Sequence, residues 1–392
     1  MSPHCSRRVF LSNLALSAAV PRNIFNFQRS DSGGTPYLAF VGRAFPGQPH
    51  LDRIETYRVD GGRWTSFGNP VDALRPQALA LHPRLPIVYA AHATAEHGNL
   101  PRGSISAFAF DAHAGDLSLL SHQPLALSAT HPDRINVSPD GRMLMVAAST
   151  GGVWNLVHLN ADGTIKAAPT PIKLTGSGPH PSQCGARPHS AVFHLDGRCV
   201  YATDFGSDHI DTIELSELDD CRSVPTLANR LRVKAGSGPG QLFLHPSGKL
   251  LVVAKCLGPA FTVFRVAANG RLEHDPADHC PVDGEHAGAV ACSSSGDMFY
   301  FATLTRSGET KLSVLVLSES NGKLQCLQSI DLGGRPLPTQ MIAFDDELLL
   351  LNNDGIEMMP LDRHSGLRSG AISKCVLRKT DLMSLAALFL RA

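Results

Sequence analysis

A set of polar residues occupies matching positions in a repeated sequence pattern, and their side chains could hydrolyse a cyclic ester. Three of them could carry the reaction: His189, Asp204 and Lys255. An imidazole titrates near neutral pH and can take a proton from water, while a cation can stabilise the charge that grows on a carbonyl oxygen. We therefore expect His189 to be the base, Asp204 to orient it, and Lys255 to hold an anionic group or the oxyanion.

Other polar residues at matching positions are expected to bind the substrate. They are Arg43, His92, Asp133, Arg134, Gln241 and Asn352. Arginine side chains are suited to a carboxylate or phosphate group of a ligand. A plainer interpretation stays open for each residue, because polar side chains also line the ends of strands without doing chemistry. Asp204, in "DFGSD", can equally be a turn residue whose carboxylate bonds the backbone.

The elements that position these residues are hairpins of two alternating strands, repeated along the chain. Each hairpin begins near a proline or an equivalent residue, and the starts are spaced 48 to 56 residues apart. These starts are Pro76, Pro132, Pro188, Pro239, Ala287 and Pro338. A fixed period in this range indicates a repeat architecture, and the strand-like runs that follow each hairpin give about four strands per unit, as in a propeller blade.

Two pieces of the chain remain outside the six hairpins. Residues 36–70 hold three strand-like runs, and the C-terminal "LMSLAALFL" is one more. Three strands plus one make a seventh blade assembled from both ends, which leaves no exposed sheet edge in the ring. The sequence thus predicts an all-β, seven-bladed propeller over residues 35–392, with residues 381–390 innermost in the blade that joins the termini.

The propeller geometry predicts where the polar residues meet. Within a blade, the innermost strand and the second strand run antiparallel, so the start of the first and the end of the second lie at the same rim. His189 stands at a strand start, whereas Asp204 and Lys255 stand at strand ends. We expect all three around one end of the central channel.

The chain resembles the propeller lactonase family, which includes 6-phosphogluconolactonases of that type and carboxymuconate cyclases. The stretches that carry the resemblance are "GSGPHPSQCGARPHSAVFHLDGRCVYATDFGSDHID", "GSGPGQLFLHPSGKLLVVAKCLGPAFTVFRVAANGRLE" and "SAFAFDAHAGDLSLL". The resemblance covers nearly the whole chain after residue 36 and implies a seven-bladed fold and hydrolysis of lactones. It also places His189 at the position of the family's catalytic histidine.

The sequence departs from the family pattern at several active-site positions. Gly240 and Gln241 stand where the family has arginine and histidine, Lys255 stands where it has a carboxylate, and Thr339 replaces an arginine. These departures keep a second hypothesis open, in which the chain is a non-catalytic exported propeller that binds a small molecule or a protein partner.

Composition narrows the range of partners. The formal net charge is zero and no Lys/Arg block occurs, which disfavours nucleic acid, and no apolar run approaches the roughly 18 residues of a membrane span. The nine cysteines show no zinc-binding spacing, and no other metal motif is present, so we expect no cofactor. We expect a monomer that binds a lactone or sugar-acid ligand.

Residues 1–34 differ from the rest of the chain. The leader "SRRVFLSNLALSAAVP" has an arginine pair, Arg7 and Arg8, followed by a short, mildly apolar stretch and a linker. This pattern predicts a twin-arginine export signal and therefore a periplasmic protein. The alternative is a disordered basic tail on a cytoplasmic protein.

Overall fold

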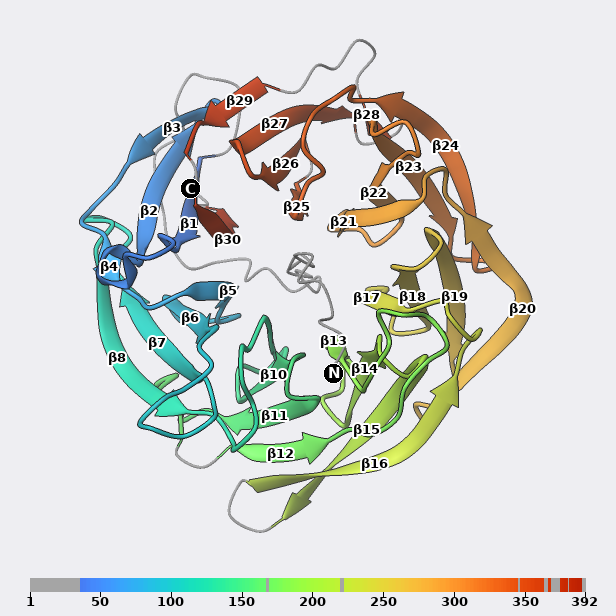
Figure 1. Cartoon of the computed structure of the whole chain (residues 1–392), viewed down its shortest axis with the longest axis horizontal. Coiled ribbons are helices and arrows are strands. Elements are labelled where there is room, and N and C mark those ends of the chain that lie inside the picture. The colour runs from blue at the N-terminus through green and yellow to red at the C-terminus, as the bar shows by residue number, and fades with distance from the viewer. Residues whose placement is uncertain are drawn as a thin grey trace, which may run out of the picture.

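The secondary structure is almost entirely β-strand. The computed structural model describes residues 36–166, 169–218, 222–344, 346–362, 366–367, 374–379 and 381–389. Their strands form seven antiparallel sheets arranged as a ring around one axis (Figure 1). The sequence-based prediction of a seven-bladed propeller is confirmed. No helix in this described part of the chain is long and apolar enough to cross a membrane.

Blades 1 to 6 follow one another along the chain. Blade 1 contains β5 (Pro76–Leu81), β6 (Ile87–His92), β7 (Ser104–Phe110) and β8 (Leu117–Pro124). Blade 2 contains β9 (Arg134–Val137), β10 (Met143–Ala148), β11 (Val153–His158) and β12 (Thr170–Lys173). Blade 3 contains β13 (Pro188–Phe193), β14 (Cys199–Asp204), β15 (His209–Leu218) and β16 (Arg222–Arg232).

The next three blades have the same strand order. Blade 4 contains β17 (Pro239–Leu244), β18 (Leu250–Lys255), β19 (Ala260–Val266) and β20 (Leu272–Pro281). Blade 5 contains β21 (His286–Cys292), β22 (Met298–Leu304), β23 (Thr310–Ser318) and β24 (Lys323–Asp331). Blade 6 contains β25 (Gln340–Ala343), β26 (Glu347–Asn352) and β27 (Gly355–Asp362), with β28 (Gly366–Leu367) and β29 (Lys374–Leu377) both paired to β27.

Blade 7 joins the two ends of the chain, as the strand count predicted. Its strands are β30 (Leu382–Phe389), β1 (Tyr37–Arg43), β2 (Arg53–Asp60), β3 (Arg63–Ser66) and β4 (Val71–Asp72). β30 is the innermost strand and pairs antiparallel with β1 from Tyr37↔Phe389 to Gly42↔Ser384. This pairing closes the ring, while the predicted leader and linker of residues 1–34 lie outside the described residues.

The hydrophobic core is divided into clusters that lie between neighbouring blades. Strand β1 shows why: Leu38 and Phe40 pack towards blade 1, whereas the alternate residues Ala39 and Val41 pack towards blade 6. Successive side chains of a strand point to opposite faces of a sheet, so a strand that is apolar at every position buries both faces. Each blade therefore needs a neighbour on both sides.

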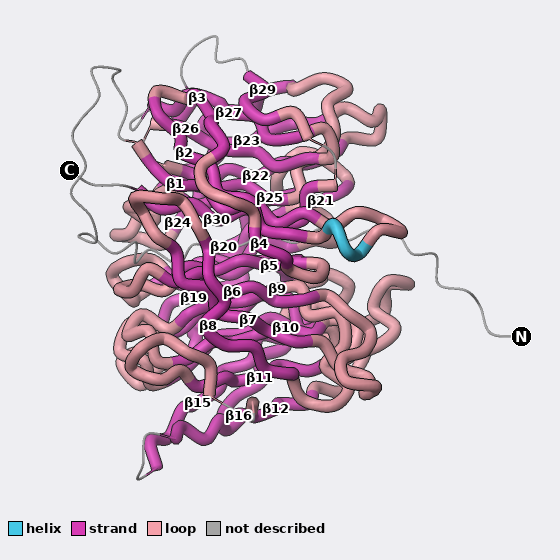
Figure 2. Tube along the Cα trace, turned by 90° about the vertical axis from the view of Figure 1, so that its left-hand side faces the viewer, coloured by secondary structure: helices cyan, strands magenta, loops and turns pink. Residues whose placement is uncertain are grey.

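Two rims of the ring differ in which loops they carry. The loop between β1 and β2 holds a short 3-10 helix, η1 (Pro49–Leu51), on the right-hand rim in Figure 2. The strand β13 begins and β14 ends at this rim, since Pro188 pairs with Asp204. In blades 1 to 6 the tight turns between the first and second strands lie at the opposite rim.

Candidate active site

His189 lies at the start of β13, where the ladder with β14 is irregular. The register shifts between Pro188 and Ala191, so His189 stands in a bulge and outside the regular pairing. Bulges re-aim side chains and are frequent beside active sites. The imidazole stacks on Phe205 with ring centroids 6.2 Å apart, and its Nε2 lies 3.3 Å from a guanidinium nitrogen of Arg134.

The contact with Arg134 defines the protonation state of His189. A guanidinium has only donors, so Arg134 donates to Nε2, and the ring proton must be on Nδ1. Burial lowers the pKa of His189 well below its usual value, and the charges of Arg134 and Arg187 lower it further. The imidazole is therefore neutral at neutral pH, as a base must be.

Arg134 comes from blade 2 and is nearly buried. One guanidinium nitrogen donates to the backbone oxygen of Asp133 at 3.0 Å and lies 3.7 Å from its carboxylate, which also accepts a hydrogen bond from Ser149. Burial raises the pKa of Asp133 and lowers the pKa of Arg134. The contact between Arg134 and His189 crosses the seam between blades 2 and 3, because the two residues belong to different sheets.

Arg187 is a site residue that the sequence reasoning missed. Its guanidinium carbon lies 5.4 Å from the ring centroid of Phe205, the same ring on which His189 stacks. Its charge acts on His189, Asp133 and Arg134 together. The signal in the sequence was the arginine that directly precedes the strand-start proline, which also occurs at Arg75.

Cys256 is the second residue that the sequence reasoning missed. It follows β18 directly, and its Sγ lies 3.9 Å from Nε2 of His189, while burial raises the pKa of its thiol to about 11. A side chain on Gly240 would overlap this sulfur and come within 3.6 Å of Cε1 of His189. The Cys256 side chain thus fills the space that an arginine at position 240 would occupy.

Comparisons with known proteins agree with this architecture. Residues 47–366 match the family model described as "Lactonase, 7-bladed beta-propeller". The chain belongs to this lactonase family. It is 27% identical over 229 residues to a 6-phosphogluconolactonase of Formosa agariphila, a match that covers 57% of this chain and 64% of the relative. The chain therefore spans less than two thirds of the length of that relative.

Two further proteins show the same likeness. A 6-phosphogluconolactonase of Bacillus subtilis is 22% identical over 238 residues, which cover 59% of this chain and 65% of the relative. The structure of the periplasmic gluconolactonase of Pseudomonas aeruginosa superimposes with a TM-score of 0.78 at 22% identity, covering 91% of this chain and 100% of that chain. This structural likeness supports the fold of the lactonase-family chain.

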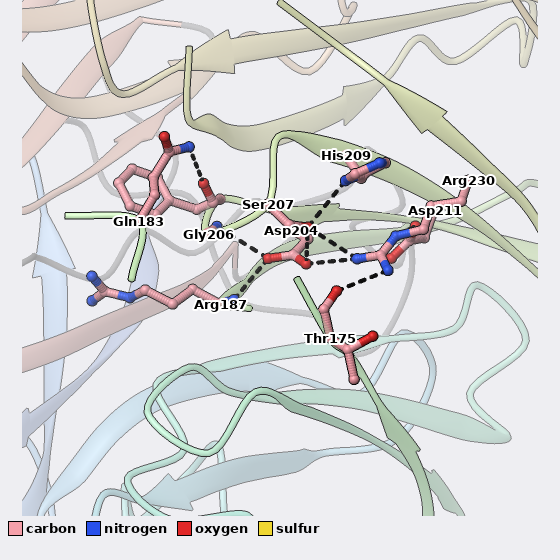
Figure 3. A network of polar contacts seen from close by, with 10 residues as sticks. Thr175, Gln183, Arg187, Asp204, Gly206, Ser207, His209, Asp211 and Arg230 are labelled. Atoms are coloured by element: carbon pink, nitrogen blue, oxygen red, sulfur yellow. Dashed lines mark hydrogen bonds and ion pairs between the residues drawn. The ribbon is translucent and has the colours of Figure 1, made fainter. Parts of the chain in front are cut away.

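Asp204 lies on the expected rim but does not bond the His189 ring. The carboxylate is fully buried and accepts the backbone N–H groups of Arg187 and Gly206 and the side chains of Ser207 and Arg230 (Figure 3). Both oxygens are thereby occupied. The expectation that Asp204 orients His189 is wrong: Asp204 instead fixes the backbone that leads into β13.

Three other predicted site residues of this lactonase-family chain are bonded within their own blades. Arg43 forms a 3.0 Å ion pair with Glu55, and Asn352 donates to Glu357 at 2.9 Å. His92 is bonded to the Leu74 carbonyl oxygen at 2.7 Å and to Ser106 at 2.8 Å, and burial lowers its pKa to about 4. Their position at strand ends was predicted, but a neighbouring strand already supplies a partner for each.

Gln241 and Lys255 are buried on blade 4 of the lactonase fold. The side chain of Gln241 points into the protein without a hydrogen-bond partner among the described residues. Its equivalent in blade 6, Gln340, bonds the backbone of Leu385 in the next blade. Burial lowers the pKa of Lys255, and the charge of Lys234 adds to this effect.

His, Cys, Asp and Glu side chains are the potential metal ligands in the described part of the chain. No group of three His, Cys, Asp or Glu side chains there is placed to hold an ion. The site that the geometry assembles consists of a neutral imidazole, two guanidiniums, a thiol and the carboxylate of Asp133. Such a set can accept a proton and bind an anion without a metal.

Proposed function

We propose that this chain hydrolyses a lactone at the rim site formed by His189, Arg134 and Arg187. The observation that carries the proposal is the neutral His189 imidazole, whose Nε2 lies 3.3 Å from the Arg134 guanidinium. A base and a cation are thus adjacent, which is the arrangement that water attack on a carbonyl requires. Membership of the lactonase family and the names of the relatives support the same reaction class.

In the proposed reaction, His189 carries a proton from water to the leaving group. Water attacks the lactone carbonyl carbon while its proton passes to Nε2 of His189. The negative charge on the carbonyl oxygen is stabilised by the guanidinium of Arg134. When the ring C–O bond breaks, the imidazolium returns the proton to the alkoxide, so lactone and water give a hydroxy acid. A lowered pKa makes the imidazolium a stronger acid and favours this last transfer.

Arg134 also controls access to the base. In the structure its guanidinium occupies the Nε2 lone pair, which water would need. The carbonyl oxygen of a bound lactone can accept the same N–H groups, and it binds them more strongly as negative charge develops on it during water attack. We propose that substrate binding draws Arg134 away from Nε2 and frees the base when the carbonyl is in place.

The observed contact also favours a second candidate, a binding protein without catalysis. If Arg134 stays on Nε2 when a ligand is bound, the site holds an anion and has no free base. Steady-state assays separate the two candidates. The purified chain should be mixed in turn with gluconolactone, 6-phosphogluconolactone and an aromatic-acid lactone, and the protons released by the hydroxy acid product should be measured. Turnover of any of them supports the hydrolase; ligand binding without turnover supports the binding protein.

We further propose that the chain is exported through the leader at Arg7 and Arg8. An exported enzyme would meet unphosphorylated lactones more readily than cytoplasmic sugar phosphates, so we expect gluconolactone to be preferred. Cell fractionation of the wild type and of an Arg7→Lys, Arg8→Lys double variant tests this point. Export is supported if the variant remains unprocessed in the cytoplasm, and is contradicted if compartment and processing are unchanged.

A further inference from the structure

A cleft lies at the rim opposite the candidate active site. It has a volume of about 470 Å³ and is bordered by three turns: residues 82–86 between β5 and β6, residues 138–142 between β9 and β10, and residues 159–165 between β11 and β12. The first turn belongs to blade 1 and the other two belong to blade 2. The cleft therefore lies across the seam between two sheets.

Hydrogen bonds between the turns hold the walls of this cleft. The Nε2 of His82 lies 3.1 Å from the backbone oxygen of Gly141, and its Nδ1 accepts the backbone N–H groups of Arg84 and Leu85. On the other side, the hydroxyl of Tyr89 donates to the backbone oxygen of Gly163 at 2.9 Å. These bonds tie blade 1 to both turns of blade 2, so the cleft is formed before any ligand arrives.

The lining of the cleft combines apolar and cationic groups. Met143 and Leu159 are buried apolar residues in its lining, and Leu85 is packed against the same hydrophobic cluster as Leu159. The charged side chains around them are Arg84, Arg142, Lys166 and a single carboxylate, Asp140.

The cations of the cleft outnumber its one acid. The carboxylate of Asp140 already accepts Ser138 and the backbone of Arg142, and lies 3.9 Å from the Arg142 side chain. Neither Arg84 nor Lys166 forms an ion pair with another residue in the described ranges. Arg84 and Lys166 thus lie at the edge of an apolar cleft in which Asp140, the one carboxylate among the lining residues, is already bonded.

We propose that this cleft binds a small organic anion with an apolar body, such as an aromatic carboxylate, sulfonate or phosphate monoester. The apolar residues would cover the ring or hydrocarbon part of the ligand, and Arg84 and Lys166 would hold its anionic group. The volume falls within the usual range of small-molecule sites. This site is independent of the proposed lactone hydrolysis, because it lies at the other rim and shares no residue with it.

Fluorescence titration with anilinonaphthalene sulfonate, an aromatic sulfonate, tests the proposal. The test variant is Arg84→Glu with Lys166→Glu. The matched control is Arg198→Glu with Lys249→Glu, which makes the same charge change on the same rim, in the turns between the first and second strands of blades 3 and 4. Phenylnaphthylamine, which has the same rings without the sulfonate, reports how much the anionic group contributes. If circular dichroism shows that the test variant does not fold, the milder double variant Arg84→Gln, Lys166→Gln takes its place.

We expect the sulfonate to bind the test variant roughly tenfold more weakly than it binds the wild type. Its affinity for the control variant should stay within about twofold of the wild-type value. We also expect the neutral amine to bind the wild type more weakly than the sulfonate does. Equal weakening in both variants would show a general charge effect and overturn the proposal. So would equal affinity for the amine, or a loss of sulfonate binding in Arg134→Gln, which alters only the opposite rim.

Discussion

The guanidinium of Arg134 lies 3.3 Å from Nε2 of His189, although the two residues are 55 positions apart and belong to different blades. The contact holds a neutral imidazole against a cation at the seam of two sheets. Burial is the larger cause of the lowered pKa of His189, and the charge of Arg134 adds to it, so we propose that the two side chains act as one unit. Several consequences of this unit can be measured.

The first consequence concerns the pH dependence of hydrolysis. Burial and the neighbouring guanidiniums lower the pKa of His189, so the base stays deprotonated below its usual pKa, and the acid limb of kcat/KM should lie below pH 6.5. Arg134→Gln removes one cation and should move that limb to higher pH, while kcat/KM falls. An acid limb that stays in place or moves to lower pH would show that the charge of Arg134 does not lower the pKa of His189.

A second prediction concerns the space shared by Gly240 and Cys256. Gly240→Ala should reduce stability by about 1–3 kcal/mol, because the added methyl group overlaps the Cys256 sulfur. Cys256→Gly should recover most of this loss in the double variant. Urea unfolding of the wild type, the two single variants and the double variant gives the coupling energy between positions 240 and 256. Additive effects of the two substitutions would show that the sulfur does not limit position 240.

Gly240 also shows where prediction from sequence reached its limit. The hairpin period and the leftover strands were sufficient for the seven blades and for the closure of the ring by β30 and β1, because strand pairing and burial follow local alternation. The atoms nearest to position 240 belong to Cys256 and Ala254, at the end of the neighbouring strand β18, and the place of the sulfur depends on the side-chain conformation of Cys256. Nothing in the period of the sequence indicates that Cys256 fills the space of the missing side chain.

Asp204 gives a third prediction, on stability. Asp204→Ala leaves Arg230, Ser207 and two backbone N–H groups without their buried acceptor, and should cost about 3–5 kcal/mol in the free energy of unfolding. The control is Asp196→Ala, which removes an exposed acid from the turn of the same blade and should cost less than about 1 kcal/mol. Similar small losses in both variants would contradict the anchoring role of Asp204.

The contacts of Asp204 point to a limit that concerns Arg43 and His92 as well, whose roles in substrate binding stay predictions. The repeat correctly placed all three at strand ends on one rim. Whether a strand-end side chain is available to a substrate depends on the third strand of the blade and on the loop that follows. Ser207 and Arg230 engage Asp204, Glu55 engages Arg43, and Ser106 engages His92.

A fourth prediction follows from Asp211, which lies beside Asp204 and shares Arg230 with it at 3.2 Å. Burial raises its pKa from 3.8 to about 7, although Arg230 opposes the rise and the Asp204 charge adds to it. The folded protein thus keeps a proton that the unfolded chain releases above pH 4. Stability should therefore fall as pH rises from about 4 to 7, by on the order of 2 kcal/mol.

Asp211→Asn removes this titration and provides the comparison. Its free energy of unfolding, measured by urea denaturation, should depend less on pH than that of the wild type between pH 4 and 7. Above about pH 8 the two profiles should run parallel, since Asp211 is then ionised in both the folded and the unfolded wild type. Parallel profiles over the whole range would mean that Asp211 is already ionised in the folded protein at pH 4.

The most direct measurement of the central claim is the steady-state hydrolysis of gluconolactone by the wild type and by His189→Ala at pH 7. The matched control is His50→Ala, which removes an exposed histidine on the same rim. We predict that kcat/KM falls by a factor of ~10² or more in His189→Ala and is unaffected in His50→Ala, with circular dichroism showing that both variants are folded. Full activity in the His189→Ala variant would contradict the claim that His189 is the base.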